Sequence, residues 1–487
     1  MTRSKPFQSL LGLSAVLILV AWWTTSGWAQ SVNTDAKTLQ DSYERYKELS
    51  EKGLFDEAFP HANFILTYAK KVYGPQHPNV ASPLDLVGRL YEGQGNYTEA
   101  AAYYQQALSI REEAHGQGSQ HVAGGLINLG SVREKEARYN EARRIFSRAL
   151  KIQEETKPPD DKKIASALDH VARISFYLAD YGNAESLFLR SLEIRKGLPK
   201  EHPELIAMSF TNLGALYQTL GRYEEAEARH REALWARENK YGHEHPRVAE
   251  TLNGLALVYE SQSRYPEAER AYRRALIIKE NTLGLAHPST ARSLNNLSLL
   301  YTKRGKYTKA LELFQRIKAP TRKVGGLMHP EYAAVLGNLA SLNVKAGLFE
   351  EAEAFYKHAL KIYEGWLGPE HPDVASGLNN LASLYELKGR YVEAERLYGR
   401  SLAIREKSLG PKHPSTATTL TNIAMMYRSQ NQFREALGWS RRFTKIMKSR
   451  YSVSQTGQNI GRLSEQKGAR GSFYLHIDLA LQPTIVR

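Results

Sequence analysis

An aromatic side chain recurs along this chain at a fixed interval of 42 residues, from Phe55 to Phe433. An alanine follows each aromatic by three residues, from Ala58 to Ala436. The ten aromatics are Phe55, Tyr97, Tyr139, Tyr181, Tyr223, Tyr265, Tyr307, Phe349, Tyr391 and Phe433. A fixed period of this length is typical of stacked repeats, in which each unit buries its apolar face against its neighbours. We therefore predict one array of ten units rather than several separate globular domains.

Each unit has the pattern of two helices. In the ninth unit, apolar residues such as Leu378 and Leu381 follow Pro372 at helical spacing. Proline is favoured at a helix start and glycine just past a helix end, which places the end of the first helix before Gly389. The second helix begins near the aromatic, and its alanine, here Ala394, allows two helices to cross closely. Added bulk at such a contact typically costs about 1–3 kcal/mol, so the alanine indicates packing rather than chemistry.

The ninth unit resembles a tetratricopeptide repeat, lengthened from about 34 to 42 residues. The matching residues are Leu381, Ala382, Tyr385, Gly389, Tyr391, Ala394, Tyr398 and Ser401. The segments LNNLA, GRY and EHP make the chain similar to kinesin light chains and their bacterial relatives over about residues 40–449. The resemblance implies an all-α, right-handed superhelical solenoid of about ten helix pairs. It also implies that the first helices line a concave groove, where extended peptides bind.

Kinesin light chains hold the backbone of bound peptides with asparagines in the first helices, and three positions of this chain match them. They are Asn253, Asn295 and Asn379, while Gly337 interrupts the series. Because an asparagine amide both donates and accepts hydrogen bonds, it can bind a peptide backbone of any sequence. A second column of asparagines, which includes Asn338, is better explained as a tie between neighbouring turns of the repeat.

Basic side chains one or two turns away from the matching asparagines add candidates for the same groove. They are Arg89, Arg173, Arg292, Lys303, Lys345 and Arg428. Glu260 and Glu386 interrupt them. The balance favours a protein or peptide partner that is acidic or carries a carboxylate.

Enzyme chemistry is not expected. The chain has no cysteine, no phosphate-binding glycine loop, no serine-hydrolase elbow and no zinc-protease motif. Seven histidines, from His77 to His413, each precede a proline, which favours an extended turn between units. Ligands of one metal ion must all lie within about 2 Å of it, whereas neighbouring helices pack about 8–10 Å apart. We therefore expect no cofactor, no metal site and no catalytic residue.

The two ends of the chain differ from the array. Arg3 and Lys5 precede an apolar run from Leu10 to Trp23, and small residues follow. This pattern predicts a signal peptide, residues 1–29, and an exported protein that is periplasmic or secreted. An uncleaved membrane anchor is the alternative. Residues 30–449 then form the repeat array, and residues 450–487 form a basic tail.

The sequence thus favours a scaffold for protein interactions in the cell envelope or outside the cell. One alternative follows from the net charge of +15: a basic surface that binds an acidic polymer or an anionic membrane. Nucleic acid is not an expected partner of an exported protein, but membrane contact through the signal segment or the tail stays open. Another alternative is the regulatory repeat half of a lost caspase-like (CHAT) protein, because Gly438–Leu481 faintly resembles that junction.

One unit departs from the helical pattern. Pro320 falls where the second helix of the seventh unit would continue. Because proline removes a helical hydrogen bond and clashes with the preceding turn, we predict that this helix ends or bends near Ala319.

Overall fold

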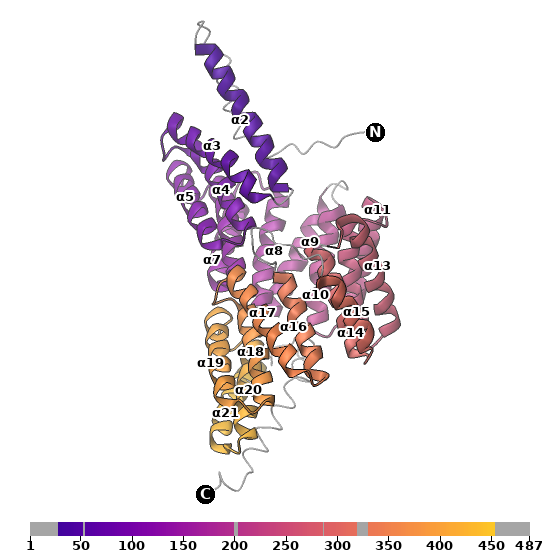
Figure 1. The fold of residues 1–487 in the computed structure, drawn as a ribbon. Coiled ribbons are helices and arrows are strands. Elements are labelled where there is room, and N and C mark those ends of the chain that lie inside the picture. The colour runs from indigo at the N-terminus through magenta and orange to yellow at the C-terminus, as the bar shows by residue number, and fades with distance from the viewer. Residues whose placement is uncertain (1–27, 52–53, 199–202, 286, 319–329, 453–487) are drawn as a thin grey trace. The chain divides into compact units, whose positions relative to one another are not determined.

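The computed structural model describes residues 28–51, 54–198, 203–285, 287–318 and 330–452 (Figure 1). Every regular element among them is helical: twenty α-helices and one short 3₁₀ helix, η2 (Pro78–Val80). The predicted all-α solenoid of tandem helix pairs is therefore confirmed. The chain divides into two compact units, residues 1–135 with 151–156 and residues 136–150 with 157–487.

The helices alternate between a first and a second member of each repeat. Every second helix begins at the recurring aromatic, from Phe55 in α3 to Phe433 in α21. The pairs are α2 (Trp28–Glu51) and α3 (Phe55–Tyr73), α4 (Ala81–Gly93) and α5 (Tyr97–His115), α6 (Gln120–Lys135) and α7 (Tyr139–Glu155), α8 (Asp161–Tyr177) and α9 (Tyr181–Gly197), α10 (Pro203–Thr219) and α11 (Tyr223–Tyr241), α12 (Pro246–Ser261) and α13 (Tyr265–Leu283), α14 (Pro288–Lys303) and α15 (Tyr307–Lys318), α16 (Pro330–Lys345) and α17 (Phe349–Leu367), α18 (Pro372–Leu387) and α19 (Tyr391–Ser408), and α20 (Pro414–Ser429) and α21 (Phe433–Ser452).

The turn between the two helices of a repeat contains one residue with positive φ. Glycine fills it in several repeats, for example Gly221 (φ 76°) and Gly389 (φ 71°). Ala137, Ala179, Ser263 and Asn431 adopt the same conformation with φ between 56° and 61°. A side chain in this left-handed region costs free energy that glycine avoids. The turn geometry is thus kept even where the sequence lacks the favourable residue.

Histidines in the turns between repeats cap the helix that follows. The His-Pro pattern predicted an extended turn but not this hydrogen bond. The Nδ1 atom of each capping histidine accepts a hydrogen bond of 3.1–3.2 Å from the backbone N–H two residues later. The five histidines for which this bond is present are His77, His245, His287, His371 and His413. Since the first N–H groups of a helix have no partner within the helix, these bonds cap it.

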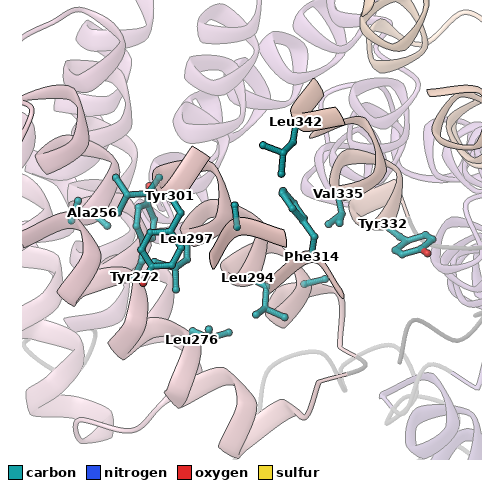
Figure 2. Close-up of a cluster of buried hydrophobic side chains, with 14 of the residues drawn as sticks. Ala256, Tyr272, Leu276, Leu294, Leu297, Tyr301, Phe314, Tyr332, Val335 and Leu342 are labelled. Atoms are coloured by element: carbon teal, nitrogen blue, oxygen red, sulfur yellow. The ribbon is translucent and has the colours of Figure 1, made fainter. Parts of the chain in front are cut away.

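The core consists of several clusters of small and large buried side chains between neighbouring helices of each compact unit. The alanine after each aromatic, from Ala58 to Ala436, is 0% exposed in all ten repeats, which confirms its packing role. One cluster joins residues from α12 to α17, including Tyr272, Leu294 and Phe314 (Figure 2). Within each compact unit, neighbouring repeats therefore contribute to shared clusters, as expected for stacked units.

The second helix of the seventh repeat is described only in part. Helix α15 is described over 12 residues, up to Lys318, where the described residues stop. The predicted end or bend near Ala319, and Pro320 itself, lie outside the described residues.

Candidate binding face on the first helices

The first helices of the second compact unit lie next to one another in chain order. Helix α10 contacts α12, and contacts of the same kind continue through α14, α16, α18 and α20. We call the surface formed by these six helices the first-helix face. It carries all the sequence-predicted binding residues except Arg89, which lies on α4, and Arg173, which lies on α8.

The three predicted asparagines, which we call the asparagine column, connect successive first helices. Asn253 donates from Nδ2 to Ser293 Oγ at 3.0 Å. Asn295 Oδ1 accepts from Asn338 Nδ2 at 2.8 Å. The same bond recurs on α18 and α20, where Asn379 Oδ1 accepts from Asn422 Nδ2 at 3.1 Å. The second column, as seen at Asn338 and Asn422, thus ties neighbouring repeats as predicted.

The asparagine column differs in accessibility along its length. Asn253 and Asn295 are 7% and 9% exposed, while Asn379 is half-buried. Asn253 Oδ1 has no hydrogen-bond partner among the described residues. At Gly337, a β-carbon would meet no other atom within 4 Å, so there is open space where an asparagine would continue the column. A ligand would therefore meet its most accessible amide at Asn379, beside this space.

Two of the predicted basic residues lie close to a carboxylate of a neighbouring first helix. Arg292 on α14 donates to Glu331 Oε1 on α16, with Nε at 2.8 Å. Lys303 Nζ on α14 lies 3.3 Å from Glu260 Oε1 on α12. Both basic side chains are about half exposed, so they stay in contact with solvent while partly neutralised.

The other four predicted basic residues lie on four different helices. Lys345, Arg428 and Arg89 are exposed near the ends of their helices, and the Arg173 guanidinium lies 2.9 Å from His170 Nδ1. Arg292 and Lys303 lie on the same helix, α14, but about 16 Å apart along its axis, and their partners are on different helices.

An exposed apolar row, which sequence reasoning missed, lies one helical turn beyond the asparagine column. Leu257 on α12 and Leu299 on α14 are 38% and 37% exposed, and Met425 on α20 is 49% exposed. Each follows the position of the asparagine column by four residues, so it lies on the same side of its helix. The sequence does contain a sign of this row. The position holds Leu or Met in some repeats but Ala215, Ser341 or Ser383 in others.

Glu386 on this face is bound by its own repeat and by the next one. Tyr398 OH on α19 donates to Glu386 Oε2 at 3.0 Å, and Ser429 Oγ on α20 lies 3.5 Å from Glu386 Oε1. Burial raises the pKa of the Glu386 carboxyl, while these two hydrogen bonds act to lower it. Glu386 is therefore part of the joint between repeats rather than a free charge on the face.

The joints also contain buried cations that the sequence analysis did not identify. Arg195, Arg237 and Arg405 each donate to a carbonyl oxygen ten residues later and to a hydroxyl oxygen fourteen residues later. Lys279 occupies the same register and donates only to Ser289 O, at 3.2 Å, among the described residues. Burial and the nearby Arg292 lower the pKa of Lys279 to about 8. The signal for these residues was the recurrence of Arg or Lys at multiples of 42 residues.

Comparison with protein families decides the identity of the repeat. A tetratricopeptide-repeat model matches residues 49–113, 122–197, 205–281, 258–319, 331–407 and 373–449. The chain belongs to the tetratricopeptide-repeat family. Its similarity to kinesin light chains, expected from the sequence, is also seen among solved structures.

Three solved structures illustrate the similarity of this tetratricopeptide-repeat protein to others. BtubC (BKLC) from P. vanneervenii is 22% identical, with 47% of this chain and 89% of that chain covered and a TM-score of 0.39. A kinesin-light-chain-like repeat protein from Podospora anserina is 27% identical, with coverage of 43% and 98% and a TM-score of 0.34. Aspartyl phosphate phosphatase F from Bacillus subtilis is 17% identical, with coverage of 77% and 94% and a TM-score of 0.46.

The family assignment rests on the repeat model, since all three TM-scores are below 0.5. No curated protein matches the sequence. Tetratricopeptide repeats are typically interaction scaffolds rather than catalysts. Across the described helices, none is long and apolar enough to cross a membrane. The predicted signal peptide lies almost entirely outside the described residues, since the structure begins at Trp28.

Proposed function

We propose that this tetratricopeptide-repeat protein is a non-enzymatic scaffold that binds an extended segment of a partner protein along the first-helix face. The asparagine column carries the proposal. Each of its amides binds a neighbouring repeat through either its NH₂ group or its oxygen. Asn379 is accessible beside the open space at Gly337. An amide with one unused donor or acceptor can bind a peptide N–H or C=O whatever the peptide sequence.

The exposed apolar row gives this binding mode a source of affinity. Leu257 and Leu299 lie on neighbouring helices, one turn from Asn253 and Asn295. Burial of apolar surface stabilises a complex by roughly 25 cal/mol per Å². We therefore expect a bound segment to place apolar side chains over the leucines and acidic groups toward Arg292, Lys303 and Lys345.

The cellular setting follows from the sequence. A signal peptide at residues 1–29 would deliver residues 30–487 to the periplasm or the exterior, where envelope or secreted proteins are the available partners. In this proposal the repeat array, residues 30–449, supplies the binding face, and residues 450–487 form a separate basic tail.

The test is partner capture from envelope extract with residues 30–487 as bait. One variant carries Leu257→Glu and Leu299→Glu, which change exposed side chains only. A second carries Asn379→Ala with Gly337→Asn, which moves the accessible amide by one repeat. A control carries Asn63→Ala, Asn239→Ala and Asn281→Ala, which are exposed asparagines of second helices.

We expect the control to capture the same protein as the unchanged chain, and the glutamate variant to lose it. Circular dichroism must show equal helicity for all baits. Cross-linking followed by mass spectrometry should place the captured segment on α12 to α18. If the glutamate variant captures the protein undiminished, the first-helix face is not the binding surface.

A further inference from the structure

The last helix of the array has an outer face unlike that of any other second helix. On α21, Arg434, Arg441, Lys445 and Lys448 are all exposed. Their spacing of seven, four and three residues places them on one side of an α-helix. The stripe extends over about 21 Å, because a helix rises about 1.5 Å per residue. We call these four residues the terminal basic stripe.

The opposite side of α21 holds the helix in place. Ala436, Leu437, Phe443 and Met447 are at most 4% exposed and pack into the last core clusters. The one basic residue of α21 that has an ion pair among the described residues is Arg442, whose guanidinium lies 2.7 Å from Glu406 on α19. The four residues of the stripe have no such carboxylate partner within the described part of the chain.

The other repeats provide an internal control for this arrangement. In the register of Lys448, four inner second helices have a glutamate that binds an arginine of a following second helix at 2.6–2.7 Å, while α9 has Lys196. These pairs are Glu238 with Arg274, Glu280 with Arg316, Glu364 with Arg400, and Glu406 with Arg442. In the register of Arg434, the inner repeats have uncharged or acidic residues such as Val392 and Glu350. Basic residues also occur in these registers elsewhere, but among the described second helices only α21 has a basic residue in all four.

We propose that the terminal basic stripe is a docking surface for an anionic lipid bilayer. Four cations in a line on the convex side of a helix cannot enclose a small anion, but they can lie against a flat array of phosphate and carboxylate groups. Each Lys or Arg near an anionic leaflet contributes about 1 kcal/mol. The stripe contains no aromatic side chain, whereas proteins that bind single-stranded nucleic acid rely on aromatic stacking. This inference concerns a surface distinct from the first-helix face and goes beyond the proposed scaffold function.

The test measures binding of residues 30–487 to phosphatidylcholine vesicles that contain about one third phosphatidylserine. The stripe variant carries Arg434→Gln, Arg441→Gln, Lys445→Gln and Lys448→Gln. The matched control carries Lys70→Gln, Lys71→Gln, Lys309→Gln and Lys361→Gln, four exposed lysines of other second helices, so the change in net charge is equal. Both proteins retain the basic tail.

We expect the stripe variant to bind about a thousand-fold more weakly than the unchanged chain, and the control variant to bind nearly as well. Arg434→Lys with Arg441→Lys should bind normally, since a bilayer is recognised by charge rather than by guanidinium geometry. Binding should weaken as salt is raised and should be absent with phosphatidylcholine alone.

Three results would overturn the proposal. Equal losses in the stripe and control variants would mean that net charge, not the stripe, drives binding. Equal binding to neutral vesicles would exclude recognition of anionic lipid. Tighter stripe-dependent binding to poly-glutamate or to duplex DNA than to the vesicles would assign the stripe to an acidic protein or a nucleic acid instead.

Discussion

The fifth and ninth repeats fill the same core position with different side chains. In the ninth repeat, Tyr398 occupies it and donates its hydroxyl hydrogen to Glu386. In the fifth repeat, His230 occupies it and Gln218 stands in the register of the glutamate. Neither ring nitrogen of His230 has a hydrogen-bond partner in the described part of the chain. The comparison teaches that a repeat can keep the shape of its core while losing the polar partner that comes with it.

Two glycines explain how the fifth repeat accommodates the histidine. A β-carbon at Gly214 on α10 or at Gly254 on α12 would lie 2.7 or 2.6 Å from the ring of His230. The ring is therefore enclosed by helices on both sides and is 1% exposed. Burial, together with the nearby Arg237, lowers the pKa of His230 to about 4.

The charged residues on the helices around His230 are engaged elsewhere or lie at a distance from the ring. Helix α10 has one such residue, Glu204, which pairs with Arg237 and Arg247. Helix α12 carries Arg247, Glu250 and Glu260, and none of them forms a hydrogen bond to the ring. No neighbouring carboxylate therefore compensates a proton on His230.

The largest expected difference between the two repeats comes from their buried arginines. Arg237 pairs with the buried Glu204, whereas Arg405 forms its described hydrogen bonds with uncharged oxygens. Arg237→Met should cost about 3–5 kcal/mol, since it removes one partner of a buried ion pair. Arg405→Met should cost only about 1 kcal/mol. The lost hydrogen bonds destabilise the fold, but the variant also avoids the desolvation cost of a buried cation, which offsets part of this loss. Urea unfolding monitored by hydrogen exchange of each repeat would measure both. Equal losses of stability in the two variants would show that the ion pair of the fifth repeat adds nothing beyond the hydrogen bonds that both arginines form.

Low pH should destabilise the fifth repeat relative to the ninth, by a somewhat smaller free energy. A histidine with an ordinary pKa of 6.5 when unfolded and about 4 when folded takes up its proton first in the unfolded state. Stability is therefore full above about pH 6.5 and falls as the pH drops toward 4, by about 3 kcal/mol in total. His230→Phe, the residue of the third, fourth and seventh repeats, should remove this dependence from α10–α13.

The measurement is hydrogen exchange of α10–α13 and of α18–α21 at several pH values, corrected for the intrinsic exchange rate. His230→Gln serves as a second variant, since it lowers stability at every pH but cannot titrate in this range. A loss of stability of α10–α13 at low pH that survives both substitutions would assign the effect to another titrating group.

The helices that follow the two repeats should respond alike to loss of their caps. His245 caps α12 and His413 caps α20 in the same way. His245→Ala and His413→Ala should each cost about 1 kcal/mol, and replacement by Asn should restore most of it. Thermal unfolding of the four variants would measure these changes. Failure of asparagine to restore stability at either position would indicate that histidine packing, rather than the cap, is the main contribution.

The smallest effect is expected at the turns within repeats. Gly221 and Gly389 have positive φ in the fifth and ninth repeats, and Ser263 adopts the same conformation in the sixth. Ser263→Gly should stabilise the chain by about 0.5–1 kcal/mol, and Gly389→Ala should destabilise it by a similar amount. The melting temperatures of the two variants should shift in opposite directions. A Ser263→Gly variant that melts lower would show that the serine side chain has a role beyond the turn.

The sequence predicted the fold in considerable detail. The interval of 42 residues, the aromatic at the start of every second helix and the buried alanine all follow from local packing rules. A glycine such as Gly389 also marks its turn, because a residue with positive φ favours glycine. These features could be predicted because each depends on a single repeat and its nearest neighbour.

The binding face was harder to predict. The burial of Asn253 and the bond from Asn338 to Asn295 depend on how one repeat is rotated against the next, which no single repeat encodes. The buried position of Arg237 depends on Glu204 and Thr251 of neighbouring helices in the same way. His230 was not predicted, because it is an exception at a position that most other repeats fill with Tyr or Phe.

The arginine–glutamate pairs between second helices restrict how such a chain can lengthen. Each pair joins residues 36 positions apart, and only the sixth and ninth units of 42 residues carry both an arginine and a glutamate of such pairs, so duplicating either of these two units would leave every pair intact. A copy added after α21 would instead bring its arginine against Lys448, and the two positive charges would repel each other. Duplication of the sixth or ninth unit therefore preserves the pairs between repeats, whereas a copy placed after α21 would set two positive charges against each other.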